Sequence, residues 1–149
     1  MTQEDKNLVI KDITARLPYD VKCKILETDE IKILSSVRHD WENTLFDFWE
    51  DERKIQYEYQ LYLSEFKPYL FPLSSMTDEL WDKEFRGLGI PEFTRDSFKY
   101  GIETLELDNG SIDFSNIVKF ISQLIKHHFD IYGLIPMGLA LDATGLNIY

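Results

Sequence analysis

Residues 115–135, SNIVKFISQLIKHHFDIYGLI, carry the strongest periodic pattern in the chain and its only adjacent histidines. Apolar side chains recur there at the spacing of one helix face: Ile117, Val118, Ile121, Leu124 and Ile125. Phe120 widens this stripe, and the Ser115 hydroxyl suits an N-cap. Gly133 and Pro136 interrupt any continuation beyond His128. The pattern predicts a helix over 115–128 that is buried along this stripe.

The segments before this helix alternate between strand-like and helix-like patterns. Period-two alternation predicts strands over 19–26, 31–37 and 55–63, and a hairpin over 102–114. Helices are expected over 2–17 and from Thr77, where a capping residue precedes two acidic ones. Three segments are less regular: 38–53 fits either a helix or an aromatic strand, 67–76 is a proline-punctuated connector, and 89–100 is irregular or a short helix.

These elements predict the α+β class. We expect a single antiparallel sheet of about four to six strands, with the C-terminal helix packed on one face and short additional helices around it. No internal repeat or linker is visible, so residues 1–149 are expected to form a single domain.

The charge of the chain narrows the classes of partner. Asp and Glu number 27 and Lys and Arg 16, which gives a formal charge of −11. Such a surface repels phosphates and anionic membranes, so we expect neither direct nucleic-acid binding nor membrane association. A basic protein partner is compatible with it.

The location of the protein follows from what the sequence lacks. It contains no apolar run of 18 residues, and the start MTQEDKNLVIKD lacks the basic and apolar regions of a signal peptide. The single Cys23 has no internal disulfide partner. We therefore expect a cytoplasmic protein.

His127, His128 and Asp130 are the residues most suited to chemistry. Adjacent helical residues point about 100° apart, so the two histidines are poorly placed to share one metal ion. A zinc site needs further ligands at close spacing, and only His39 and Cys23 remain. A role for His128 in packing at the helix end is the interpretation we favour. We expect no metal and no cofactor, and we keep a metal-binding protein or small enzyme using these three residues as the alternative.

Ser74 and Ser75 are the other candidates for chemistry. No Gly-x-Ser-x-Gly turn surrounds them. Capping of the following helix therefore explains them better than a nucleophilic role.

Three blocks of the sequence resemble a known family: ARLPYDVK at 15–22, KPYLFPLSSMTDE at 67–79 and KHHFDIYGLIPMGLALDA at 126–143. They are similar to RLPYG-V, KPYLRP-SSMT and HHFDYRGLI in small uncharacterised phage and prophage proteins of anaerobic gut bacteria. The resemblance implies a phage origin and a bacterial host cell, but no activity. This chain has Asp20 where the family tends to have Gly, and Phe71 and Tyr132 where it tends to have Arg.

Aromatic residues in place of two arginines suggest an apolar contact surface. The candidate surface comprises eight residues: Tyr69, Phe71, Ser74, Ser75, His127, His128, Asp130 and Tyr132. We further predict that residues 67–76 and 127–135 pack against each other, either as a structural corner or as a shared binding surface. In the second case Phe71 and Tyr132 are expected to be exposed neighbours.

The function expected from the sequence is non-enzymatic: a phage-derived protein–protein interaction protein with an acidic surface. An inhibitor of a basic host or phage protein, acting as an acidic mimic of nucleic acid, is the sharper form of this expectation. The identity of the partner, the biological process and the oligomeric state do not follow from the residues.

Overall fold

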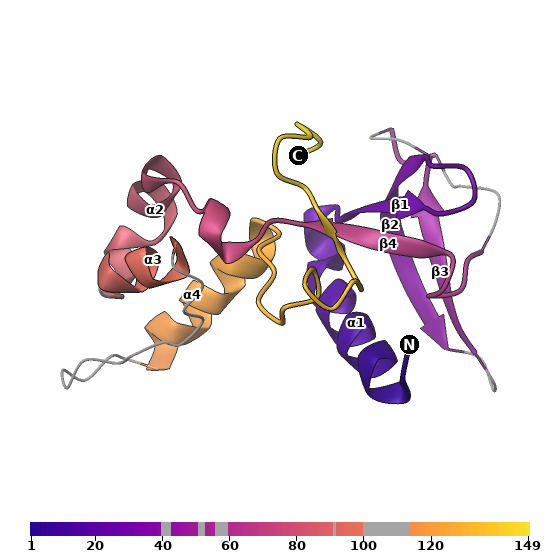
Figure 1. The fold of residues 1–149 in the computed structure, drawn as a ribbon, viewed down its shortest axis with the longest axis horizontal. Helices are drawn as coiled ribbons and strands as arrows, with labels where there is room; N and C mark the ends of the chain where they lie inside the picture. The colour runs from indigo at the N-terminus through magenta and orange to yellow at the C-terminus, as the bar shows by residue number, and fades with distance from the viewer. Residues whose placement is uncertain (40–42, 51–52, 56–59, 91, 100–113) are drawn as a thin grey trace. The chain divides into compact units, whose positions relative to one another are not determined.

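The structure is a computed structural model that describes residues 1–39, 43–50, 53–55, 60–90, 92–99 and 114–149. The α+β class is confirmed, with five strands and four α-helices in these ranges (Figure 1). The chain divides into two compact units, residues 1–70 with 132–149 and residues 71–131. Each unit has its own apolar core. That the two units behave as a single domain remains a prediction.

The first unit contains the sheet. Its strands are β1 (Lys22–Ile25), β2 (Ile31–His39), β3 (Thr44–Trp49), β4 (Phe66–Leu70) and β5 (Leu141–Asp142). They are ordered β3-β2-β1-β4-β5, and only the β4–β5 pair is parallel. The prediction of an antiparallel sheet is therefore wrong at this edge, because β5 follows a long excursion of the chain and returns in the same direction as β4.

The helix that lies against the sheet is α1 (Gln3–Arg16). Figure 1 shows it beside the strands. Its buried Val9 and Ile13 share a core with side chains of four strands, among them Cys23, Leu34 and Phe66. Thr2 and Asp5 form the expected capping box at its N-terminus. The buried side chains Phe120 and Leu124 of α4 belong to the core of the second unit.

Two strand predictions need correction. Residues 67–76 were expected to be only a connector, but Pro68 lies within β4, which pairs with β1 and β5. The strand predicted over 55–63 is represented in the described part by an isolated bridge between Leu61 and Phe46. Residues 56–59 lie outside the described residues, as do residues 102–113 of the predicted hairpin. The ambiguous segment 38–53 contains the strand β3.

The second unit is helical: α2 (Asp78–Glu84), α3 (Glu92–Lys99) and α4 (Phe114–Lys126). Its core stacks the rings of Trp81 and Phe85 at 5.5 Å, with Phe120 edge-on to both. The α4 side chains Phe120 and Leu124 are buried in this cluster.

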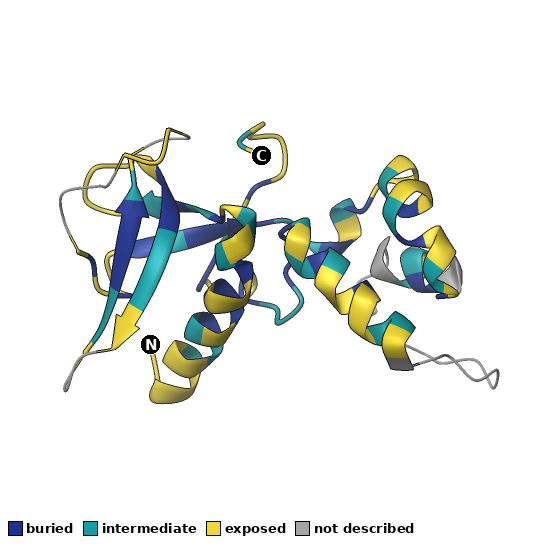
Figure 2. Cartoon of the chain, turned by 180° about the vertical axis from the view of Figure 1, so that it is seen from behind, coloured by how far each residue is buried: buried dark blue, intermediate teal, exposed yellow. Residues whose placement is uncertain are grey.

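The predicted burial of the α4 stripe is only partly right. Leu124 is buried as expected, but Val118 and Ile121 are 48% and 39% exposed, while Ile117 and Ile125 are half-buried. Helical spacing gives the width of an apolar stripe but not which side of it meets a core. The core of the second unit contacts the Phe120 side, so the other side remains open to solvent (Figure 2).

Within the described ranges, no helix has the length and apolar character needed to cross a bilayer.

One buried ion pair anchors α1. Arg16 donates from Nε and from an NH2 group to the two carboxylate oxygens of Asp12, at 2.8 and 2.7 Å. Both side chains are essentially inaccessible to solvent. Removing one partner of such a pair leaves a charge in the core and is strongly destabilising.

We expect Asp12→Ala to lower the free energy of unfolding by about 3–5 kcal/mol. The matched control is Asp82→Ala, which removes an exposed Asp–Arg pair of the same i,i+4 spacing with Arg86 and should have a far smaller effect. Urea denaturation followed by circular dichroism measures both. Equal losses of unfolding free energy in the two variants would show that burial does not increase the contribution of the Asp12–Arg16 pair to stability.

A second comparison tests which side of α4 is structural. Leu124→Ala should cost about 2–5 kcal/mol, because it opens a cavity in the core of the second unit. Ile121→Ala removes the same number of carbon atoms from an exposed position of the same helix and should change stability little. Denaturation measurements that rank the two variants in the opposite order would contradict this assignment of the α4 faces.

Candidate functional site

The predicted packing of residues 67–76 against 127–135 is confirmed at the backbone. The Phe71 N–H donates to the His128 carbonyl at 2.9 Å, and the Asp130 N–H donates to the Phe71 carbonyl at 2.8 Å. These bonds make a parallel bridge between Phe71 and Phe129, whose rings are 6.3 Å apart. Leu73 and Phe129 belong to the same apolar cluster. The corner therefore exists as a structural element of the second unit.

The eight residues of the predicted surface do not form one exposed patch. They divide by burial: Tyr69, His128 and Asp130 are buried, Phe71, Ser75, His127 and Tyr132 are half-buried, and Ser74 is exposed. Phe71 packs on the core of the second unit, whereas Tyr132 packs on that of the first unit. The prediction that Phe71 and Tyr132 are exposed neighbours is thus wrong in its first part, since each ring is held by a core. Lys11 places its Nζ 5.1 Å from the centre of the Tyr132 ring.

His128 terminates α4. Its φ is +60°, a left-handed conformation that ends the helix. Its N–H donates to the Ile125 carbonyl at 3.0 Å, and its own carbonyl accepts the bond from Phe71. Both backbone groups and the buried ring are consistent with the structural role that the sequence favoured.

His127 faces the acidic side chain of Glu84 on α2. The His127 Nε2 is 3.7 Å from the Glu84 Oε2, and the Lys126 Nζ is 3.5 Å from the same oxygen. Burial lowers the pKa of His127 below its ordinary value, and Lys126 adds to this effect while Glu84 opposes it. Desolvation of Glu84 is outweighed by Lys126, His127 and Lys83, which together lower the pKa of that carboxyl. At neutral pH this arrangement is a neutral imidazole beside a carboxylate and two lysines.

The described residues bring no three metal-ligand side chains together. No group of at least three His, Cys, Asp or Glu among them is placed to hold a metal ion. His127, His128 and Asp130 in particular do not converge. Burial strongly raises the pKa of the Cys23 thiol, which keeps it protonated.

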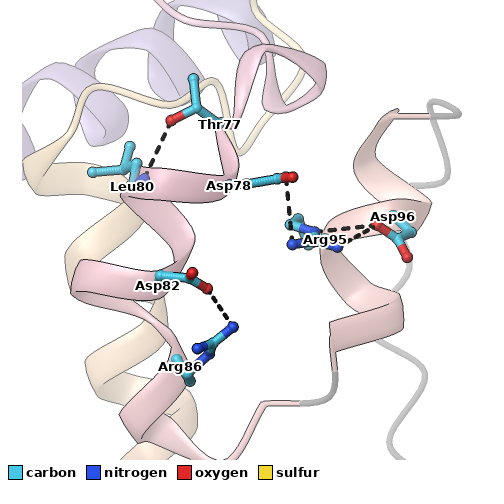
Figure 3. Close-up of polar contacts among 7 residues, drawn as sticks. All are labelled: Thr77, Asp78, Leu80, Asp82, Arg86, Arg95 and Asp96. Carbon is cyan, nitrogen blue, oxygen red and sulfur yellow. Dashed lines mark hydrogen bonds and ion pairs between the residues drawn. The ribbon is translucent and has the colours of Figure 1, made fainter.

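Ser75 and Thr77 both have structural roles before α2. The Ser75 hydroxyl donates to the Pro72 carbonyl at 2.7 Å, which closes a short turn. Thr77, rather than either serine, caps α2 by accepting from the Leu80 N–H at 3.2 Å (Figure 3). Ser74 is exposed and has no base beside it that the structure describes.

The outward side of α2 is a network of charges. Arg95 on α3 lies 3.3 Å from Asp78 and 3.0 Å from Asp96, and Arg86 lies 2.7 Å from Asp82 (Figure 3). Most of these side chains are exposed, so each pair contributes little to stability. Glu79 is exposed beside them.

The open side of α4 is the surface feature that sequence reasoning missed. Val118 and Ile121 belong to neither apolar cluster. They occupy positions i and i+3, with half-buried Ile125 at i+7. The signal was present in the sequence as a stripe that is wider than one core contact needs, because Phe120 extends it. Helical spacing alone predicts that the whole stripe is buried.

The titration of His127 gives a testable dependence of stability on pH. Its pKa is lower in the folded state than the ordinary value of 6.5. The unfolded chain therefore binds more protons just below that pH, and the stabilisation from the neutral ring is lost as pH falls through 6.5 toward the folded-state pKa. We expect the parent to lose more unfolding free energy between pH 7 and pH 5 than His127→Gln does. Denaturation curves at both pH values measure this, and equal losses would contradict it.

No family model matches this chain, and no curated protein or solved structure matches it significantly. The chemistry of its surfaces is therefore the basis on which a function can be proposed.

Proposed function

We propose that this protein is a non-enzymatic interaction protein that binds a basic partner protein through the open side of α4. The observation that supports this most is the row formed by Val118, Ile121 and Ile125, which we call the α4 row. Two of these three side chains, Val118 and Ile121, are exposed and are neighbours at i and i+3 on one side of the helix. Apolar residues at i, i+3 and i+7 are the pattern that one helix presents to another helix or to a groove.

The charge of the chain selects the kind of partner. A formal charge of −11 attracts basic proteins over long range and repels acidic ones. On α2 of the same unit, Asp78, Glu79 and Asp82 are exposed. The α4 row would supply the apolar contact and the acidic surface the attraction, which is the usual division between the core and the rim of an interface.

The biological setting belongs to the same proposal. The resemblance of the three sequence blocks supports a phage origin and action in the cytoplasm of a bacterial host. An inhibitor that occupies the binding surface of a basic host or phage protein fits both the charge and the apolar row. The alternative, metal or acid–base chemistry at His127, His128 and Asp130, gains no support from the described geometry, since the three side chains do not converge.

The proposal is tested with an amphipathic peptide of 18 residues. Its leucines are placed at helical spacing so that they form one face of a helix, and its lysines form the other face. Fluorescence anisotropy should show that the peptide binds the parent protein. Val118→Ser with Ile121→Ser should weaken binding by about tenfold or more, which corresponds to about 1.4 kcal/mol. Because both side chains are exposed, the free energy of unfolding should hardly change.

Two controls separate apolar docking from attraction to net charge. Lys119→Ser alters an exposed residue of the same helix and should leave binding unchanged or slightly strengthen it. A peptide with serine in place of leucine should bind the parent much less tightly. Equal binding by the parent and the double variant would show that the α4 row is not the docking surface.

A further inference from the structure

A segment of the first unit, residues 141–149, is held against the sheet at two points. At its start, β5 pairs in parallel with Tyr69 and Leu70 of β4. The N–H of the buried Ala143 then donates to the Leu70 carbonyl at 2.8 Å. These contacts are the first anchor of the segment, which is drawn in yellow in Figure 1.

The second anchor is the hydroxyl of Tyr149. It accepts from the Lys22 N–H at 2.9 Å and donates to the Tyr69 carbonyl at 2.8 Å. The direct pairing of β1 with β4 ends at Cys23 and Pro68, so Lys22 and Tyr69 are the next residues along the two strands. The hydroxyl therefore takes the place of the next strand-to-strand hydrogen bond.

This hydroxyl is buried, although Tyr149 as a whole is 41% exposed. Burial raises the pKa of the hydroxyl above its ordinary value, and the bond from the Lys22 N–H opposes this rise only in part. The group therefore keeps its proton at neutral pH and can donate to the Tyr69 carbonyl. Removing it would take a hydrogen-bond partner from each of two backbone groups.

The part of the segment between the two anchors is held much less. Residues 144–147 are exposed. Two local hydrogen bonds shape this part: the Thr144 N–H donates to the Asp142 carboxylate at 2.8 Å, and the Leu146 N–H donates to the Ala143 carbonyl at 3.1 Å. Exposed backbone with few buried apolar contacts opens at a low free energy. The position of the segment therefore depends on its two ends.

The segment also forms one side of a groove of about 440 Å³. The groove is lined by Asn147, Ile148 and Tyr149 from the segment and by Lys22, Ile31 and Ile33 from the sheet. With the segment in place, Ile33 is only 5% exposed. Movement of the segment away from β4 would remove one side of the groove, so its position controls access to this part of the sheet.

We propose that residues 141–149 form a strap that opens and closes as one unit, with the Tyr149 hydroxyl as its lock. The turn between the anchors is short and is tied by its own hydrogen bonds to Asp142 and Ala143. Release of the lock is therefore transmitted to the first anchor, as in other small cooperative units of a protein. The strap does not depend on the partner proposed for α4, because its residues belong to the first unit.

Amide hydrogen exchange followed by NMR tests the strap. Tyr149→Phe keeps the ring and removes only the hydroxyl. We expect the N–H groups of Lys22 and Ala143 both to exchange about tenfold faster than in the parent. The Ala143 N–H is decisive, because the substitution does not touch its bond to Leu70. Faster exchange at Lys22 alone, or at neither residue, would overturn the proposal.

Two controls separate local opening from general destabilisation. The Phe46 N–H donates to the Leu61 carbonyl at 2.9 Å elsewhere in the same unit, and its exchange should not change. Tyr62→Phe makes the same chemical change at a side chain that is 49% exposed, and it should leave all three amides unchanged. Equal acceleration at Phe46, or an equal effect of Tyr62→Phe, would overturn the proposal.

A second variant loosens the strap without touching either anchor. Asp142→Ala removes the carboxylate that accepts from the Thr144 N–H, and because Asp142 is exposed the protein should still fold. We expect the N–H groups of Lys22 and Ala143 to exchange faster by similar factors, about threefold, which corresponds to one exposed hydrogen bond. Unchanged exchange at Lys22 would show that the two anchors open separately and would overturn the proposal.

Discussion

The buried pair of Asp12 and Arg16 is the constraint on which the first unit depends. Two charges enclosed in an apolar core are tolerated only when each satisfies the other, and here the guanidinium meets the carboxylate through two hydrogen bonds. The pair lies in the last turns of α1, so it fixes the helix end from which the chain turns into β1. That turn ends at Asp20 with φ +54°, a conformation that glycine adopts without strain.

The chain changes its pairing partner at the end of β4. Within the first unit, β4 pairs in parallel with β5, and the Leu70 carbonyl accepts from the Ala143 N–H. One residue later, within the second unit, Phe71 pairs in parallel with Phe129. The strand thus changes partner between Leu70 and Phe71. Gly133, with φ +69°, lies just after the second pairing segment, where the chain leaves it for the segment that leads to β5.

The α4 row and the cross-strand pair of Lys24 with Lys67 arise in different ways. The α4 row is apolar and belongs to a single helix, so its spacing is visible in the sequence. Lys24 and Lys67 come together only when β1 and β4 pair, because they are 43 residues apart in the chain.

The sequence by itself determined the α+β class, the capped starts of α1 and α2, the strand pattern of β1 and β2, and the close approach of residues 67–76 to 127–135. These features depend on local periodicity and on residues with fixed backbone preferences, which act within a few positions. Only the tertiary structure decided that α1 shares the core of the sheet and α4 the core of the second unit, that Pro68 lies in a strand, and that Val118 and Ile121 stay exposed. The apolar pattern of an amphipathic helix predicts that one of its sides is covered. Which surface covers that side depends on residues far away in the chain. For the same reason the sequence does not predict that Asp12 and Arg16 pair inside a core. Opposite charges at i and i+4 form the same sequence pattern whether they are buried or exposed.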